Sequence, residues 1–242
     1  MFGRAIEWHS TITSTNDVAA ARAERGAIEG TTIVAGEQSG GRGRQGRTWA
    51  SPPESGLYVS IVLRPANTEA PLITIAAGVA IVEGIAAATG LVTALKWPND
   101  VYVGMRKLAG ILAEGAASSS AIAYVVLGFG INVRPGVWPP DVAARATSIE
   151  GELGRAVDRG IVLAECLAAF ASRYDDLQRG RGEDVVAAWR VHARPLLNRA
   201  VEWTGPRGVE RGIAQDIDSS GALLVRAGSG VSRVVSGEVR WI

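Results

Sequence analysis

The chain has few of the residues that build metal centres and nucleophilic triads. Its 242 residues include one cysteine and two histidines. A single cysteine, Cys166, excludes an internal disulfide, and its apolar helical setting favours a buried, inert thiol. His9 and His192 stand in neither a metal-ligand nor a triad spacing, so zinc binding and Ser-His catalysis lose support.

Net charge is small and long uncharged apolar runs are lacking. The formal net charge of +1 gives no electrostatic reason to expect duplex nucleic acid as a partner. The first ten residues lack the apolar core of a signal peptide, and the most apolar stretch, residues 72–95, is interrupted by Glu83 and several glycines. Hydrophobic residues make up 47% of the chain, which is enough for a packed core. We therefore expect a folded cytoplasmic protein that binds neither DNA nor membrane.

The expected helices and strands alternate irregularly along the chain. Helices are predicted over residues 17–22, 73–88, 161–177 and 183–193, and strands over residues 31–35, 57–63, 92–96, 100–103, 107–114 and 121–133. This order lacks strict βαβ alternation, so it favours an α+β fold, a mixed β-sheet with flanking helices, over a doubly wound sheet.

The composition changes towards the C-terminus. Five short β-type runs follow one another at residues 201–203, 209–213, 222–225, 231–235 and 238–242. Short strands separated by turns are typical of a small β-barrel. We therefore predict two domains, residues 1–194 and residues 195–242.

The most distinctive segment is residues 40–49, hereafter the glycine–arginine loop. Its glycines formally match G-x-G-x-x-G, but residues 50–56 contain two prolines and cannot open the helix that a dinucleotide site needs. Its three arginines repel one another and its glycines lose entropy on ordering, so we expect a loop that is mobile until an anion arrives. Guanidinium groups bind phosphate bidentately, which favours an anion site over the alternative of a solvated basic loop.

The glycine–arginine loop resembles the signature of biotin–protein ligases, which carry a Gly-Arg-Gly-Arg-x-Gly-Arg-x-Trp segment. Four further segments resemble that family and occur in its order: residues 14–16 (Ser-Thr-Asn), 96–100 (Lys-Trp-Pro-Asn-Asp), 106–112 (Arg-Lys-Leu-Ala-Gly-Ile-Leu) and 128–133 (Gly-Phe-Gly-Ile-Asn-Val). The resemblance spans about residues 10–135 and extends more loosely to the C-terminal part.

The resemblance implies a fold, a reaction and a partner. The fold is a mixed sheet with helices, related to class II synthetases, plus a C-terminal SH3-like barrel. In the reaction, the biotin carboxylate attacks the α-phosphate of ATP, and a lysine of a biotin carboxyl carrier domain of an acyl-CoA carboxylase then takes the biotinyl group; Mg²⁺ accompanies ATP. Family members are monomers or homodimers, and either is expected here. Some relatives add an N-terminal helix-turn-helix, but only 13 residues precede Ser14, so we expect no repressor role.

The resemblance also assigns residues to the two substrates. Biotin is expected to contact Ser14, Thr15, Asn16, Gln38, Gly41, Arg42, Gly43, Arg44, Lys107, Gly110 and Ile111. ATP is expected to contact Arg42, Arg44, Arg47, Trp49, Lys96, Asn99 and Asn132. The expected catalytic cations are Lys107, Arg42 and Lys96, because fixed cations stabilise charge that accumulates on phosphate oxygens.

Each assignment has a structural alternative. Ser14 or Thr15 caps the following helix, Lys96 is a structural cation, Trp49 is a core residue, and Gly110 with Ile111 forms an ordinary strand. Asp100 is either an Mg²⁺ ligand, an orienting partner for a lysine, or a turn cap.

Two other functions remain open from the sequence. One is a lipoate or octanoyl ligase of the related fold. The other is a non-catalytic RNA-binding module that uses the basic loop and the C-terminal barrel.

Overall fold

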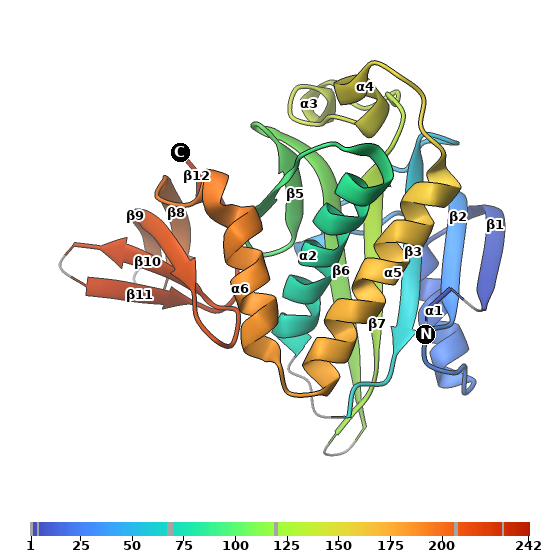
Figure 1. The fold of residues 1–242 in the computed structure, drawn as a ribbon, viewed down its shortest axis with the longest axis horizontal. Coiled ribbons are helices and arrows are strands. Elements are labelled where there is room, and N and C mark those ends of the chain that lie inside the picture. Colours follow the sequence, from blue (N-terminus) through green and yellow to red (C-terminus); the bar gives the residue numbers. More distant parts are fainter. Residues whose placement is uncertain (1, 4, 67–69, 119–120, 206–207, 229) are drawn as a thin grey trace.

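Two β-sheets organise the chain, which confirms the predicted α+β class (Figure 1). The computed structural model describes residues 2–3, 5–66, 70–118, 121–205, 208–228 and 230–242. The larger sheet has the strand order β1-β2-β3-β7-β6-β5-β4. Its strands are β1 (Ile6–Ile12), β2 (Thr32–Gln38), β3 (Gly56–Leu63), β4 (Ala94–Lys96), β5 (Asp100–Val103), β6 (Arg106–Ser118) and β7 (Ala121–Asn132). The β1–β2 pair is parallel and the other pairs are antiparallel, so the sheet is mixed.

Three long helices cover one face of this sheet and a shorter one covers the other. The helices are α1 (Thr15–Glu24), α2 (Ala70–Thr89), α3 (Pro140–Ala143), α4 (Ile149–Leu153), α5 (Arg159–Gln178) and α6 (Gly182–Ala193), with short 3-10 turns η1 (Arg44–Gly46) and η2 (Arg194–Leu196). Helices α2, α5 and α6 lie side by side in front of the sheet in Figure 1. Helix α1 packs on β2, β3 and β7 from behind.

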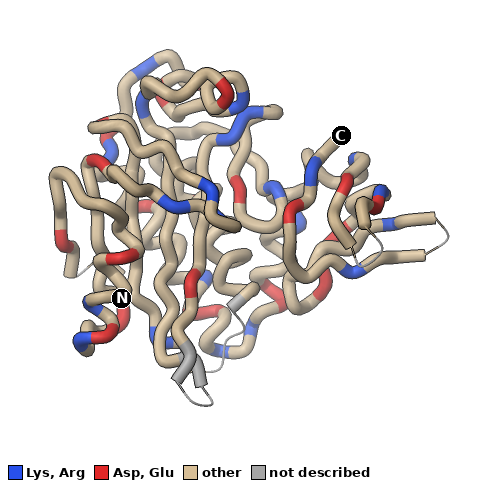
Figure 2. The backbone as a smooth tube through the Cα atoms, turned by 180° about the vertical axis from the view of Figure 1, so that it is seen from behind, with Lys and Arg blue, Asp and Glu red and all other residues tan. Residues whose placement is uncertain are grey.

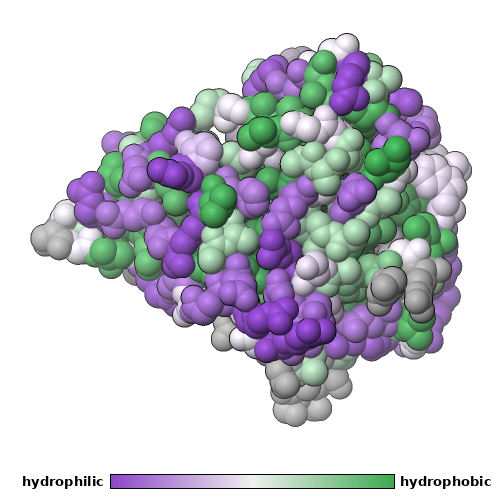
Figure 3. Space-filling model, in the orientation of Figure 1, coloured by the Kyte–Doolittle hydropathy of each residue, from purple (hydrophilic) through white to green (hydrophobic). Residues whose placement is uncertain are grey.

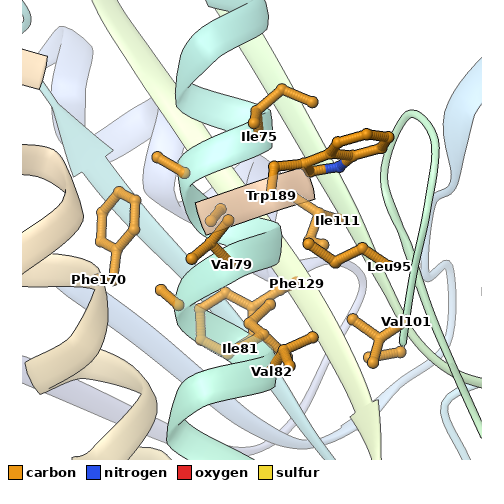
Figure 4. Packing of buried hydrophobic residues seen from close by; sticks show 14 of the residues in the cluster. Ile75, Val79, Ile81, Val82, Leu95, Val101, Ile111, Phe129, Phe170 and Trp189 are labelled. Atoms are coloured by element: carbon orange, nitrogen blue, oxygen red, sulfur yellow. The ribbon is translucent and has the colours of Figure 1, made fainter. Parts of the chain in front are cut away.

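Alternation along the strands divides the core in two. In β2, Val34 belongs to the large cluster under α2 and α5, while its neighbour Ile33 belongs to a small cluster under α1. In β7, Val125 and Val126 divide in the same way. Successive strand residues face opposite sides of a sheet. Where the residues on both sides are apolar, both faces of the sheet must be covered by other elements. Figure 4 shows the large cluster, in which Phe170 and Trp189 come from helices that flank α2.

Helix α2 is the most apolar element. Its segment Pro71–Thr89 is long and apolar enough to cross a membrane by length and composition, but 67% of that window is buried inside the protein. Hydrophilic and hydrophobic residues are interspersed over the outer surface on this side (Figure 3). The packing therefore identifies α2 as a core helix.

The C-terminal strands form a separate antiparallel sheet. Its strand order is β11-β10-β9-β8-β12, built from β8 (Ala200–Gly205), β9 (Gly208–Ile217), β10 (Leu223–Ala227), β11 (Gly230–Val234) and β12 (Val239–Trp241). The five predicted strands are thus present. Within the described residues β11 and β12 do not pair with each other, so the sheet does not close on itself. The five-stranded antiparallel sheet is consistent with the predicted SH3-like C-terminal domain.

Strand β1 and helices α3 and α4 are not predicted from the sequence. Strand β1 is at the edge of the sheet, and its polar residues alternate with the exposed Ile6 and Trp8, so it lacks an apolar signal. Helices α3 and α4 have four and five residues and carry too little periodicity to detect.

Candidate active site

A cavity of about 420 Å³ lies on the face of the larger sheet that carries α1. Every residue that the resemblance assigns to biotin, ATP or Mg²⁺ lines it, with the exception of Gly41. Gly41 lies underneath, where an added Cβ would come within 2.4 Å of the Trp49 carbonyl oxygen. Figure 2 views this side of the molecule and shows basic and acidic residues mixed over it.

Glycines on two paired strands form the floor of the cavity. On the α1 face of β7, Tyr124 and Val126 are followed by Gly128 and Gly130, so the apolar cover stops where the cavity begins. Gly130 pairs with Gly110 of β6. Side chains at these positions would fill the space above the sheet, which explains why the strands carry glycine there.

The Trp49 side chain lies on this glycine floor. An added Cβ would come within 2.4 Å of Trp49 Nε1 at Gly130 and within 3.0 Å of Trp49 Cζ3 at Gly110. The indole nitrogen is buried and has no hydrogen-bond partner. Trp49 lines the cavity and belongs to neither core cluster, so it is a wall of the cavity and not a core residue.

One end of the cavity is lined by uncharged polar groups. Thr15 donates to Gln38 Oε1 through its backbone N–H (2.8 Å) and its hydroxyl (3.1 Å), and Gln38 Nε2 donates to Ser51 Oγ (2.9 Å). Ser14 is the N-cap residue of α1, yet its side chain makes no capping hydrogen bond. The Ser14 hydroxyl lines the cavity, and the structure therefore does not support the capping alternative for it.

Asn16 is held by partners that the sequence does not point to. Its Oδ1 lies 2.5 Å from Ser60 Oγ, and its Nδ2 donates to Glu114 Oε2 at 2.6 Å. The same Glu114 oxygen accepts from Arg42 at 2.9 Å. Both amide atoms of Asn16 are thus engaged. Ser60 interrupts the apolar run of β3, and Glu114 interrupts the apolar and small residues 108–117 of β6, and this irregularity is the signal that could have indicated them.

The glycine–arginine loop folds back on itself. Gly43 N–H donates to the Arg47 carbonyl (2.7 Å), and Trp49 N–H donates to the Gly41 carbonyl (2.9 Å). At the turn Gln45 and Gly46 have φ values of 57° and 72°, and glycine adopts this left-handed region without strain.

The three loop arginines point to different partners. The predicted repulsion persists between two of them, because, after burial, the charge of Arg47 contributes to the lowered pKa of Arg44. Arg42 forms ion pairs with Asp17 (2.8 Å) and Glu114 (2.9 Å). Arg47 is paired with Glu238 of the C-terminal sheet. Arg44 donates to Asn99 Oδ1 at 3.3 Å, and its burial lowers the pKa of its guanidinium.

Two lysines lie at the other end of the cavity. Lys107 Nζ is 2.6 Å from Asp100 Oδ1 and 5.3 Å from the centroid of the Trp49 ring. Lys96 Nζ is held between two aromatic rings, 4.9 Å from the centroid of Tyr102 and 4.8 Å from that of Trp241. Burial lowers the pKa of the Lys96 ammonium, and the Asp100 carboxylate opposes that shift. With Arg44, these groups make this the cation end of the cavity.

Asn99 and Asn132 fix neighbouring backbone at this end. Asn99 Nδ2 donates to the Ile111 carbonyl at 2.6 Å, and Asn132 Nδ2 donates to the Thr147 carbonyl at 3.0 Å. The Asn99 amide oxygen also accepts from Arg44, so Asn99 links the glycine–arginine loop to β6. No group of three or more His, Cys, Asp or Glu residues in the described part of the chain could hold a metal ion.

Several lining residues were missed from the sequence. They come from the segment between β7 and α4, from β5 and from β12: Trp138, Val142, Arg145, Ala146, Tyr102, Glu238, Val239, Arg240 and Trp241. Trp138, within a proline-rich stretch, was the one detectable signal among them. The cavity thus joins a neutral polar end to a cation end over a glycine floor, which suits an elongated ligand with a neutral polar head and an anionic tail.

Comparison with known proteins finds similarity to biotin protein ligases in family models, in sequences and in a solved structure. The model of the biotin/lipoate A/B protein ligase family matches residues 8–132, and that of the biotin protein ligase C terminal domain matches residues 196–240. The chain is 33% identical to the bifunctional ligase/repressor BirA of Bacillus subtilis over 99% of this chain and 74% of that protein. It is 35% identical to the biotin--[acetyl-CoA-carboxylase] ligase of Mycobacterium tuberculosis over 93% and 85% of the two chains. The biotin protein ligase from Aquifex aeolicus in complex with biotin and ATP superposes with a TM-score of 0.87 at 27% identity, covering 99% of this chain and 100% of that one.

Proposed function

The chain belongs to the biotin/lipoate A/B protein ligase family, and on that premise we propose that it activates biotin with ATP and transfers the biotinyl group to a lysine of a carboxyl carrier domain. The observation that carries this proposal is the change from uncharged polar groups at one end of the cavity to cations at the other. Ser14, Thr15 and Gln38 offer donors and acceptors to a urea at one end, and Lys107 and Lys96 offer cations at the other.

In the first step, an oxygen of the biotin carboxylate attacks the α-phosphorus of ATP. A carboxyl C–O–P bond forms, the bond between the α-phosphorus and the bridging oxygen breaks, and pyrophosphate leaves. Lys107 would stabilise the charge on the α-phosphate oxygens, with Asp100 orienting its ammonium. Trp49 would cover the reacting centre and exclude water.

In the second step, the amine of the carrier lysine attacks the adenylate carbonyl. An amide bond forms, AMP leaves with the electron pair of the carboxyl C–O bond, and the ammonium proton passes to solvent. Neither His9 nor His192 lines the cavity, so no histidine base acts in this step. The energy for it comes from the adenylate, a good leaving group.

ATP would enter as its Mg²⁺ complex, since Mg²⁺ needs only one or two carboxylates when phosphates supply further oxygens. Asp100 and Glu238 are the carboxylates among the described residues that line the cavity. Glu238 is paired with Arg47, so Asp100 would be the protein ligand. Its contact with Lys107 favours an orienting role, and the metal role stays a prediction.

A lipoate or octanoyl ligase is the alternative within the same family. A polar pocket strongly disfavours a ligand that leaves its hydrogen-bonding groups unpaired, and a dithiolane ring or an alkyl chain would do so at Ser14, Thr15 and Gln38. We expect pyrophosphate release from ATP with biotin and not with lipoate or octanoate.

The function is tested by mass spectrometry of a carrier domain incubated with the protein, Mg²⁺, ATP and biotin. We expect a single mass increase equal to one biotinyl group. No transfer by the intact protein would refute the proposal. Salt-sensitive RNA binding without ATP turnover would instead support the RNA-binding hypothesis.

The ion pairs of Arg42 give a further prediction. Asp17 and Glu114 tie this loop arginine to α1 and β6, so we expect them to keep the loop closed over the ligand. Asp17→Asn and Glu114→Gln should each speed the release of biotinyl-adenylate, by about two- to fivefold, since both pairs are half-exposed.

The sign of this effect separates two roles of Arg42. If Arg42 instead binds phosphate, freeing it from its carboxylates should slow release. Dissociation rates are measured by chasing labelled adenylate with an excess of biotin and ATP. Glu37→Gln is the control, because Glu37 bonds Thr11 and does not line the cavity.

A further inference from the structure

The ammonium of Lys96 is held in an unusual way. No carboxylate of the described residues lies within ion-pair distance of Lys96 Nζ, whereas Asp100 pairs with Lys107. The neighbours of Lys96 Nζ are the Tyr102 hydroxyl at 3.3 Å and the faces of the Tyr102 and Trp241 rings. Aromatic rings attract a cation without neutralising it. The Lys96 ammonium is therefore not neutralised by an ion pair with a described carboxylate and can pair with an anionic ligand.

The two rings come from different parts of the chain. Tyr102 is on β5 and pairs with Ala94 of β4, so it belongs to the same hairpin as Lys96. Trp241 is on β12, in the C-terminal sheet, where it pairs with Val201 of β8. Its Nε1 donates to the Leu196 carbonyl at 2.8 Å, which fixes the orientation of the indole ring.

The residue next to Lys96 also binds the C-terminal part. The Trp97 indole is buried and donates to the Gly221 carbonyl at 2.8 Å. The C-terminal part of the chain thus holds the Lys96–Trp97 segment at two points. One is the hydrogen bond from the Trp97 indole, and the other is the contact of the Lys96 side chain with the Trp241 ring.

We infer that Trp241 is a positioning residue, whose ring fixes the Lys96 ammonium at the cation end of the cavity for the phosphates of ATP. This inference rests on the proposed function, because it takes Lys96 to contact ATP. Gln38 is on β2 and Tyr102 is on β5, and strands β3, β7 and β6 lie between them in the sheet. Biotin binding at the uncharged polar end should therefore not depend on Trp241.

The test uses the full chain and biotin-dependent ATP–pyrophosphate exchange. Trp241→Leu is expected to raise the KM for ATP by about 3- to 30-fold, the range of a partly desolvated cation–π contact, and to leave the KM for biotin unchanged. Trp241→Phe keeps a ring face and should restore most of the ATP affinity. Ile242→Ala, at the exposed neighbouring residue, is the matched control and should match the wild type.

A double-mutant cycle with Lys96→Met tests whether Trp241 acts through Lys96. If it does, Trp241→Leu adds no further loss in the Lys96→Met background. Additive losses, or equal rises in both KM values, would overturn the inference while leaving an active wild type, and hence the proposed function, intact. A wild type without biotin-dependent exchange would overturn both.

A spectroscopic measurement covers the case in which Trp241→Leu fails to fold. Two rings beside Lys96 should shift its Hε resonances upfield in the wild type, where Lys96→Met identifies them by their loss. Trp241→Phe should reduce the upfield displacement without abolishing it. Lysine Hε resonances that all lie at their ordinary positions in the wild type would refute the placement of the rings.

Discussion

Replacing Lys107 by methionine is expected to abolish most adenylate formation and to leave the fold intact. Lys107 Nζ lies 2.6 Å from Asp100 and above the glycine floor, close to where a carboxylate would meet an α-phosphate. Loss of one fixed cation at such a centre costs about 10²–10³ in rate. Methionine keeps most of the length of the side chain and removes the ammonium group, so most of the packing against Trp49 should persist.

The measurement is the rate of biotin-dependent ATP–pyrophosphate exchange. Arg106→Met is the matched control, since Arg106 precedes Lys107 in β6 but pairs with Glu152 and does not line the cavity. We expect the control to retain nearly the wild-type rate. A near-wild-type rate for Lys107→Met would remove Lys107 from the mechanism.

The same variant distinguishes the two roles of Asp100. Without Lys107, the Asp100 carboxylate is left unpaired beside the phosphates and repels them. If Asp100 only orients Lys107, adding Asp100→Asn to Lys107→Met removes this repulsion and should restore part of the exchange rate. If Asp100 holds Mg²⁺, the double variant should be slower still.

The sequence predicts well those parts of the molecule in which local pattern decides the structure. Helix α2 follows from a long apolar run and β3 from a β-branched one, because most of α2 and the whole of β3 are buried. The motif residues of the cavity also follow from the sequence, since the glycine–arginine loop and four short segments in family order carry them. Their spacing along β6 and β7 explains why they meet, because Gly110 and Gly130 pair across adjacent strands.

The remaining features depend on contacts that no local pattern encodes. The ion pairs of Arg42 and Arg47 were not predicted, because their partners Asp17, Glu114 and Glu238 are remote from the loop in sequence. The sequence around Trp241 is typical of an ordinary strand, and only the fold shows that Trp241 on β12 contacts Lys96 on β4. Edge strand β1 is likewise specified by pairing with β2 and not by burial.

Replacing Gly130 by alanine is expected to lower biotin affinity by about 10²-fold, the loss that a displacement of about 1 Å can cause in a positioned site. The added Cβ would lie 2.4 Å from Trp49 Nε1 and 2.6 Å from Trp49 Cε2, closer than real contacts allow. The indole must therefore move off the floor and take the loop with it. Since the ring can move towards the cavity, the free energy of unfolding should fall by only about 1–3 kcal/mol.

Gly115→Ala supplies the matched control for this change. Gly115 is in β6, the strand paired with β7, and its added Cβ would meet nothing within 4 Å. Both variants add one methyl group to a strand, so they differ only in what the methyl group contacts. Calorimetric titration with biotin should give wild-type affinity for Gly115→Ala, and equal affinities for the two variants would contradict the role of the glycine floor.

Placing Gly130→Ala in the Trp49→Ala background shows whether the clash with Trp49 causes the loss of biotin affinity. With the indole removed, the Cβ at position 130 meets none of the three Trp49 ring atoms that are its nearest neighbours. In this background, Gly130→Ala should lower biotin affinity little beyond the decrease that Trp49→Ala already causes. The effects of the two substitutions on biotin affinity should therefore be strongly non-additive. Full additivity would mean that the bare floor at Gly130 is needed by the ligand itself and not by the tryptophan that covers it.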